Sequence, residues 1–267
     1  GFPMVVCDVQ EAASLPFLEQ GARLASSPAE VADQTDVIFS ALPGPREIEL
    51  VATGPEGVLT GIHKGAVYVD ISTNRPALIR DLEAQFRRKD AYVLEAPVLS
   101  GQPGTAPGIH SVLVGGEPEA FRRAKAVLEA FGDQILYTGP AGSANTCKLI
   151  HQLVGTIVSQ GVAEGLTLGV KSGVDLEVVW ECMRRGFLGR MYASHELAPR
   201  NIFTGDVEPS TFPLTLLRKD VGLATELGRE HGVPLPAGSL VEQILVSGVA
   251  KGWSGKSGYA VPFLAQE

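Results

Sequence analysis

The feature that most constrains this chain is a change of pattern near residue 140. Before that point, short β-rich runs alternate with segments of helical character, and after it the strand signals stop. Runs that are apolar throughout and alternate with helices are typical of a parallel sheet covered on both faces. Apolar residues spaced three and four apart are typical of helices. The sequence therefore predicts an α/β part followed by an all-α part.

In the first part we expect strands at residues 4–7, 37–40, 67–71, 92–94, 111–114 and 135–137. Helices are expected between most of them, at residues 28–34, 76–89 and 118–131. These helices begin at proline, which suits the first helical turn because its missing N–H has no helical partner there. Such a series predicts an open parallel sheet between layers of helices.

In the second part we expect helices at residues 145–172, 176–185, 214–231 and 240–251. The first of them would be about 42 Å long at about 1.5 Å per residue. We place the boundary between an α/β domain, residues 1–141, and an all-α domain, residues 142–267, at the turn that contains Gly139 and Gly142. Boundaries between domains create clefts, where small ligands commonly bind.

Charge and hydropathy exclude several classes of protein. The chain has 22 Lys and Arg against 30 Asp and Glu, a formal net charge of −8, and this argues against a nucleic-acid binder. With 45% hydrophobic and 19% charged residues, the composition is that of a globular protein. The uncharged stretch at residues 149–163 contains polar side chains and falls short of the roughly 18 apolar residues that suggest a membrane span.

The three cysteines, Cys7, Cys147 and Cys182, are an odd number without regular spacing, and no leader-like segment precedes them. We therefore expect reduced thiols and a cytoplasmic protein, with Cys147 as a small buried side chain. The five histidines have no pairwise spacing of two to four and no Cys-x-x-Cys pair occurs, so no metal site is predicted. The chain also lacks the Gly-x-Ser-x-Gly motif of serine hydrolases.

One acidic residue at a strand end is consistent with a nucleotide site. Asp8 follows the first β-rich run, like the carboxylate that binds a ribose at the second strand of a dinucleotide-binding unit. The glycine-rich turn that holds the pyrophosphate should precede that acid by about 20 residues, but no segment of the chain has this pattern. Taken alone, Asp8 is better explained as the end of a strand.

The order of five segments is more specific. Residues 42–43 and 70–73 close two strands, and residues 95–98 lead into a loop with several glycines. Residues 139–142 then precede Lys148 on the long helix, and Phe212 precedes Lys219 by seven residues. This order resembles the β-hydroxyacid dehydrogenase family over essentially the whole chain. The resemblance implies a Rossmann-like, doubly wound parallel sheet followed by an all-α domain.

The resemblance begins at the family's second strand. It implies that the family's first strand, glycine-rich turn and first helix have no counterpart in residues 1–267. Because that strand is central in a doubly wound sheet, we expect its neighbours to have unpaired backbone groups. We interpret the chain as an incomplete copy of a longer one, and the alternative is a degenerate protein.

Lys148 is the candidate catalytic acid or base. Lys148 and Gln152 are four residues apart and share one helix face, with His151 beside them. Taken alone, a lysine on a helix is usually a solvated surface charge. The resemblance implies that Lys148 exchanges a proton with the substrate oxygen as hydride moves. It also implies that Gln152 binds the substrate, and the other interpretation of Gln152 is packing or capping.

The loop after Glu95 departs from the family pattern. The family reads Asp-Ala-Pro-Val-Ser-Gly-Gly and binds the substrate carboxylate there, whereas this chain has Leu99 at the Ser position. The resemblance implies that Ser100 and Gly101 bind substrate, either after a one-residue shift of the loop or in a less polar pocket. For the glycines at 104 and 108, a plain turn is an equally good explanation.

The resemblance also implies cofactor contacts for residues at strand ends and on a later helix, namely Asp8, Leu42, Pro43, Thr73 and Lys219. Ligands of open parallel sheets bind beyond the carboxyl ends of strands, but such residues also form ordinary turns. A basic residue that would bind a 2′-phosphate is missing after Asp8. The cofactor is therefore expected to be NAD, with NADP as the second possibility.

Phe212 and Asp220 are implied to shape the substrate pocket. Without the resemblance, Lys219 and Asp220 would be taken as surface charges. Arg184 and Arg185 suggest a pocket unlike the standard one, but positive charge is also favourable at a helix end.

The expected function is an NAD(P)-dependent oxidoreductase that interconverts a small hydroxy acid and its aldehyde or ketone. Alternatives are a non-catalytic dehydrogenase-like scaffold and an imine reductase, but the latter usually lacks the lysine. The resemblance further implies a homodimer or homotetramer.

Overall fold

The computed structural model describes residues 1–99, 111–132, 134–185, 212–230, 235–258, 261 and 265. Its contacts divide the chain into two compact units, and the division falls within helix α7 (Ser143–Lys171), after Lys148. Each unit has its own hydrophobic core.

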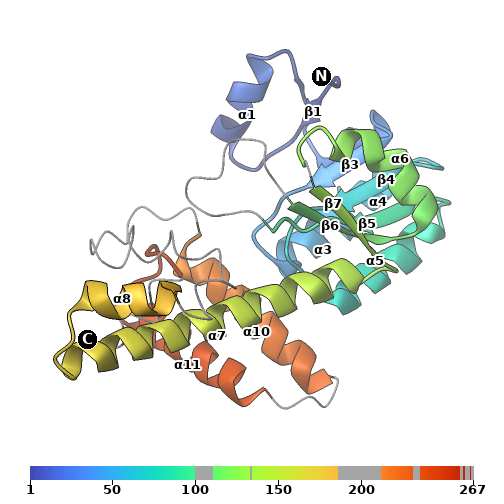
Figure 1. Cartoon of the computed structure of the whole chain (residues 1–267). Helices are drawn as coiled ribbons and strands as arrows, with labels where there is room; N and C mark the ends of the chain where they lie inside the picture. The colour runs from blue at the N-terminus through green and yellow to red at the C-terminus, as the bar shows by residue number, and fades with distance from the viewer. Residues whose placement is uncertain are drawn as a thin grey trace. The chain divides into compact units, whose positions relative to one another are not determined.

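The first unit contains a five-stranded sheet in the order β3-β4-β5-β6-β7 (Figure 1). Its strands are β3 (Val37–Ser40), β4 (Val67–Asp70), β5 (Tyr92–Glu95), β6 (Ser111–Gly116) and β7 (Gln134–Gly139). The first three run parallel and in register, so that Ser40 lies opposite Asp70, and Asp70 lies opposite Glu95. The polar residues that end these strands are therefore neighbours at one edge of the sheet.

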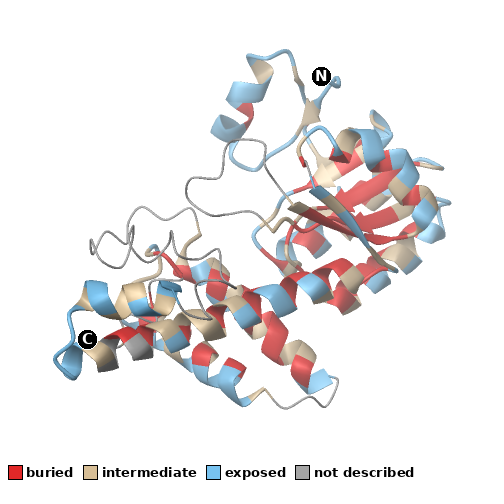
Figure 2. Cartoon of the chain, viewed as in Figure 1, coloured by how far each residue is buried: buried red, intermediate tan, exposed pale blue. Residues whose placement is uncertain are grey.

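Helices cover both faces of this sheet. The core on one face joins the sheet to α2 (Pro28–Asp33), α3 (Pro45–Thr53), α4 (Val58–Gly61) and α5 (Pro76–Arg87), and the core on the other face joins it to α6 (Pro118–Leu128). Tyr68 points to the first core and stacks on Phe86, whereas Val69 points to the second. All four residues of β4 are buried, as Figure 2 shows. These layers confirm the predicted doubly wound α/β fold.

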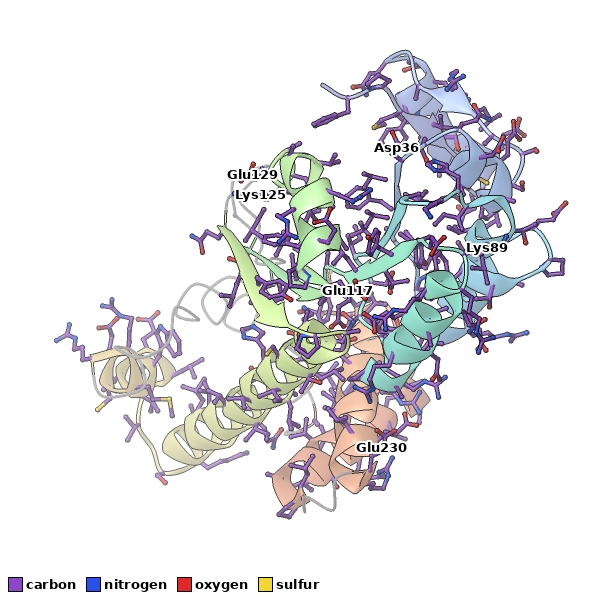
Figure 3. All side chains as sticks on the ribbon, turned by 90° about the vertical axis from the view of Figure 1, so that its right-hand side faces the viewer. Asp36, Lys89, Glu117, Lys125, Glu129 and Glu230 are labelled. Carbon is purple, nitrogen blue, oxygen red and sulfur yellow. The ribbon has the colours of Figure 1, made fainter. Side chains whose placement is uncertain are left out.

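The outer face of α6 is charged. Lys125 and Glu129 form an i,i+4 ion pair at 3.6 Å with both side chains more than half exposed, and Figure 3 labels both. Ala120, Ala124 and Leu128 form the buried face of the same helix. An exposed pair of this kind adds little stability, so α6 is held mainly by its apolar face.

One pairing departs from the parallel arrangement that we expected. β6 runs antiparallel to β5, and β7 runs parallel to β6. Beyond β5, Leu99 N–H donates to Ser111 O and Leu113 N–H donates to Pro97 O. Residues 97–99 therefore pair directly with residues 111–113, which lead into β6. A parallel strand pair normally requires a crossover connection, usually a helix, and the described residues 96–99 contain no helix.

A second, two-stranded sheet belongs to the same unit. It pairs β1 (Val5–Val6) with β2 (Arg23–Leu24) in parallel, with α1 (Glu11–Leu18) between them. Among the described residues no backbone ladder joins β1 to β3. The interruption lies where the resemblance puts its central first strand. The sequence did not predict α1 or β2, because α1 contains Pro16 and its apolar residues are not confined to one face, and because β2 has only two residues.

The second unit is helical in its described residues, as predicted. It contains the later part of α7, then α8 (Leu176–Arg185), α10 (Leu214–Glu230) and α11 (Pro236–Ala250). Leu149, Leu217 and Leu245 are fully buried and form the centre of its core. Among the residues that the structure describes, no helix has the length and apolarity needed to cross a membrane.

Candidate functional site

Lys148 is buried near the beginning of α7, with only 7% of its surface exposed. Lysine is almost never this buried unless it has a partner. Cys147, one residue earlier, is exposed, so the expectation that it is a buried side chain is wrong. Consecutive helical residues point about 100° apart, and the helix turns Lys148 inward and Cys147 outward. Cys7 and Cys182 are also free and exposed.

Gln152, Lys219 and Asp220 come together in the second unit. Gln152 Nε2 donates to Asp220 Oδ2 at 3.1 Å, and Lys219 Nζ lies 3.0 Å from Asp220 Oδ1. Gln152 and Asp220 are buried. An ionised carboxylate only accepts hydrogen bonds, so Asp220 holds the Gln152 amide with its nitrogen toward the carboxylate.

Phe212, which precedes α10, is anchored by a backbone hydrogen bond and by packing. Its carbonyl accepts a hydrogen bond from Gly258 N–H at 3.0 Å, and the half-buried ring packs against the helical core. The next residue, Pro213, forms an isolated bridge with Ser257. The segment before α10 is therefore fixed by backbone pairing.

The beginning of α7 is bound to the carboxyl end of β5 by a buried carboxylate. Glu95 Oε1 accepts from Ala144 N–H at 2.9 Å. Glu95 Oε2 accepts from Asn145 N–H at 3.0 Å and from Asn145 Nδ2 at 2.6 Å. Gly115 leaves the space for this, because a Cβ there would lie 2.4 Å from Glu95 Oε1. Backbone N–H groups at a helix start have no helical partner, and here Glu95 satisfies two of them.

The same network continues to the loop after β4. Asn145 Oδ1 accepts from Asn74 N–H at 2.6 Å, and Asn74 Nδ2 lies 3.5 Å from Asp70 Oδ2. Asp70, Asn74, Glu95 and Asn145 are all completely buried. One hydrogen-bond network therefore joins the ends of β4 and β5 to the start of α7.

Asp70 extends this network to the loop after β3. Its Oδ1 accepts from Ser40 Oγ at 3.0 Å and from Ser72 N–H at 3.1 Å. Ser72 Oγ in turn accepts from Leu42 N–H at 2.8 Å. The two loops that were predicted to contact a cofactor are thus joined to each other.

Burial dominates the electrostatics of both carboxyl groups. It raises the pKa of Glu95 and the pKa of Asp70 above their ordinary values, although their N–H and O–H donors act in the opposite direction. Burial and the neighbouring Asp70 likewise raise the pKa of Tyr68, whose hydroxyl lies 2.8 Å from Ser40 Oγ. A buried charge is costly unless it is well hydrogen-bonded, which explains the number of donors around each carboxyl group.

The residues predicted to contact a cofactor lie at strand ends. Leu42 and Pro43 follow β3 and Thr73 follows β4, and these strands are adjacent and parallel. Pro43 is exposed, whereas Leu42 and Thr73 are half-buried. Asp8 is exposed after β1, and its carboxylate accepts from Gln10 N–H. These positions fit a nucleotide bound beyond the carboxyl ends of the strands, with Asp8 available to a ribose.

Several predicted substrate residues lie outside the described residues, namely Ser100, Gly101, Gly104 and Gly108. Arg184 and Arg185 are described and exposed, and both pair with Glu181 on α8. Their contacts are those of surface ion pairs at a helix end. No group of three His, Cys, Asp or Glu side chains that could hold a metal ion occurs in the part of the chain that the structure describes.

Asn74 and Asn145, which hold this network together, were not predicted from the sequence. Asn74 follows a strand by four residues, and Asn145 precedes Lys148 by three. This i,i+3 spacing on one helix was the available signal for Asn145. The hydrogen bonds of Asn145 join residues that are distant in sequence, so no local sequence pattern predicts them.

Comparison with known proteins gives family matches along nearly the whole chain. Residues 1–139 match the NAD binding domain of 6-phosphogluconate dehydrogenase. Residues 142–261 match the NAD-binding domain of NADP-dependent 3-hydroxyisobutyrate dehydrogenase. The two matches meet at the turn that precedes α7.

Individual relatives agree with these matches. Mitochondrial 3-hydroxyisobutyrate dehydrogenase of Mus musculus is 30% identical over 261 residues, which are 96% of this chain and 78% of that protein. The 2-(hydroxymethyl)glutarate dehydrogenase of Eubacterium barkeri is 32% identical over 252 residues, 94% of this chain and 83% of its own. In fold, the chain is similar to a Mycobacterium tuberculosis 3-hydroxyisobutyrate dehydrogenase, with a TM-score of 0.86, 23% identity and coverage of 97% and 89%.

Proposed function

This chain belongs to the β-hydroxyacid dehydrogenase family, and on that premise we propose that it is an NAD(P)-dependent oxidoreductase. It interconverts a small hydroxy acid and the corresponding aldehyde or ketone. The observation that carries the proposal is the burial of Lys148 on α7, at 7% exposure. Such burial distinguishes this side chain from a solvated surface lysine.

Lys148 exchanges the proton in this reaction. In oxidation its amine removes the proton from the substrate hydroxyl, and in reduction its ammonium returns a proton to the carbonyl oxygen. The bound nicotinamide supplies the hydride acceptor or donor. The burial of Lys148 argues against a non-catalytic scaffold, and an imine reductase usually lacks this lysine.

Gln152 binds the substrate next to Lys148, since the two are four residues apart on α7. The contacts of Asp220 support a role in orienting Gln152 and holding Lys219. Following the family resemblance, Phe212 and Asp220 are the proposed substrate contacts of this helical domain, and Lys219 is a proposed cofactor contact. Ser100 and Gly101 remain the proposed contacts for the substrate carboxylate.

The cofactor binds along the carboxyl ends of β1, β3 and β4. Asp8 accepts the ribose hydroxyls, and Leu42, Pro43 and Thr73 contact the nicotinamide half. Val9 and Gln10, which follow Asp8, offer no positive charge for a 2′-phosphate, so NAD is preferred to NADP. The nucleotide-binding domain comprises residues 1–141 and the helical domain residues 142–267.

Replacement of Lys148 tests this function directly. NAD(P)⁺ reduction is measured with 3-hydroxyisobutyrate and 2-(hydroxymethyl)glutarate, the substrates in the relatives' names. Lys148→Ala should lower kcat by about 10²- to 10⁴-fold, the usual contribution of a general acid or base. Lys171→Ala, a change of an exposed lysine on the same helix, is the matched control and should retain the wild-type kcat. Activity of Lys148→Ala within threefold of wild type would refute the role.

We also propose that the chain forms a homodimer or homotetramer. Ile150 and Val154 are four residues apart on α7 and about half exposed, at 52% and 48%, so they form an apolar strip on one helix face. A second copy that covers this strip would remove it from water. Ile150→Glu together with Val154→Glu should shift the mass measured by light scattering to that of one chain. An unchanged mass would exclude this face as the interface.

The three free thiols are consistent with a reducing compartment, and we propose the cytoplasm. Immunodetection in fractionated cells tests this location, and recovery of the protein in an organelle or membrane fraction would contradict it.

A further inference from the structure

Asn145 and Glu95 hold the first turn of the helix that carries Lys148. We propose that Asn145 and Glu95 are positioning residues, which place the Lys148 ammonium group for proton exchange through the hydrogen bonds that hold α7 to the sheet. This inference rests on the proposed function, because it assumes that Lys148 exchanges the proton. Neither residue has to touch the substrate.

The hydrogen bonds leave the first turn of α7 little freedom. Two successive backbone N–H groups, of Ala144 and Asn145, donate to different oxygens of the Glu95 carboxylate. Rotation of the helix about its axis or a shift along it would break at least one of these bonds. Lys148 follows within one turn, so its position is set by the same contacts.

The side chain of Asn145 connects the helix to a second strand. Its amide nitrogen donates to Glu95 after β5, and its amide oxygen accepts from Asn74 N–H after β4. A carboxylate only accepts and an N–H only donates, so the orientation of the amide is unique. One side chain therefore ties α7 to both β4 and β5.

The same bond connects Lys148 to the proposed cofactor loop. Asn74 adjoins Thr73, and Asn74 N–H is the donor that Asn145 binds. The Asn145 amide group thus holds both the helix that carries the lysine and the loop that is proposed to contact the nicotinamide. A misplacement of reacting groups by about 1 Å can lower the rate about a hundredfold. Loss of the Asn145 hydrogen bonds should therefore lower the rate of proton and hydride transfer.

The test compares Asn145→Ala and Glu95→Gln with Ser143→Ala in the complete chain. Ser143 is in the same first turn and lies 2.8 Å from Thr138 Oγ1, so Ser143→Ala removes a hydrogen bond there without touching Glu95 or Asn145. We expect the first two variants to lower kcat by about tenfold or more with KM values within about threefold, the pattern of a lost transition-state interaction. The control should keep its kcat.

A double variant separates positioning from general destabilisation. If Asn145 acts through Lys148, Asn145→Ala should lower the residual rate of Lys148→Ala by less than about threefold, because residues that act together are not additive. Full multiplication of the two effects would overturn the inference. So would a kcat of Asn145→Ala and Glu95→Gln within threefold of wild type.

A chemical labelling experiment tests the position of Lys148 without measuring enzyme activity, so it remains informative if a variant is inactive for another reason. Carbamylation of Lys148 by cyanate, followed by mass spectrometry, should be at least about threefold faster in Asn145→Ala than in Ser143→Ala, because a lysine released from its buried position reacts faster. Equal rates would overturn the inference even if the enzyme is active. Activity that survives in Lys148→Ala would instead refute the proposed function.

Discussion

Gly115→Ala should damage the junction between the sheet and α7 without altering any of its hydrogen-bonding groups. The backbone of Gly115 is not in the left-handed region, so the substitution brings no strain of its own. The new Cβ would lie 2.4 Å from Glu95 Oε1 and 2.8 Å from Ser143 Oγ. An ordinary contact between carbon and another heavy atom is about 3.5 Å, so the carboxylate has to retreat by roughly 1 Å.

That retreat has a calculable cost. Oε1 accepts from Ala144 N–H at 2.9 Å, and a separation about 1 Å longer is no hydrogen bond. Loss of this bond leaves the buried Ala144 N–H without a partner, which costs about 1–3 kcal/mol, and more where a charged group is involved. We expect Gly115→Ala to lower the free energy of unfolding by about 2–4 kcal/mol and to lower kcat as well.

Gly161→Ala is the matched control. Gly161 is exposed on α7, and a Cβ there meets no heavy atom within 4 Å. Because alanine favours the helix over glycine by up to about 1 kcal/mol, this variant should be slightly more stable than wild type. Urea denaturation and steady-state kinetics measure both effects. If Gly115→Ala unfolds within about 0.5 kcal/mol of wild type and keeps its kcat, the carboxylate does not hold α7 as described.

Three further changes test other parts of the molecule. Since burial raises the pKa of Glu95, the native state binds its proton more tightly, and this contribution to stability is lost as pH rises through the native pKa. The stability advantage of wild type over Glu95→Gln should therefore fall as pH rises above the ordinary pKa of glutamate, by up to about 1.4 kcal/mol per unit; an advantage that grows with pH would contradict this sign. Asp220→Ala should raise the KM for the hydroxy acid about tenfold by releasing the Gln152 amide, whereas an unchanged KM would separate the two residues. Leu245→Ala, in the core of the second unit, should cost about 2–5 kcal/mol in urea denaturation, and a loss below about 1 kcal/mol would show that the site collapses around the cavity.

Local patterns predicted most of the secondary structure. The helix expected at residues 145–172 is observed as Ser143–Lys171, and that expected at 76–89 as Pro76–Arg87. Period, proline at the first turn and apolar runs are properties of neighbouring residues, which explains this agreement. The antiparallel return to β6 depends on pairing between residues 97–99 and 111–113, and no local pattern specifies such a partner.

The candidate site likewise has residues that could be predicted from local spacing and residues that could not. Lys148 and Gln152 were identified through their spacing on one helix together with the family resemblance, and their burial agrees with a site. Asn145 joins residues 71 and 50 positions away in sequence. Contacts of this kind arise only when β4, β5 and α7 meet, so they could not be predicted from the sequence.

The hydrogen bonds at the start of α7 also constrain how the gene can change in length. A helix advances about 1.5 Å and turns about 100° with each residue. An insertion or deletion between Asn145 and Lys148 would therefore carry the ammonium group to another side of the helix, whatever amino acid was added or lost. Insertions and deletions in related sequences should therefore occur elsewhere. The three-residue spacing between Asn145 and Lys148 should be kept even where the residues between them differ.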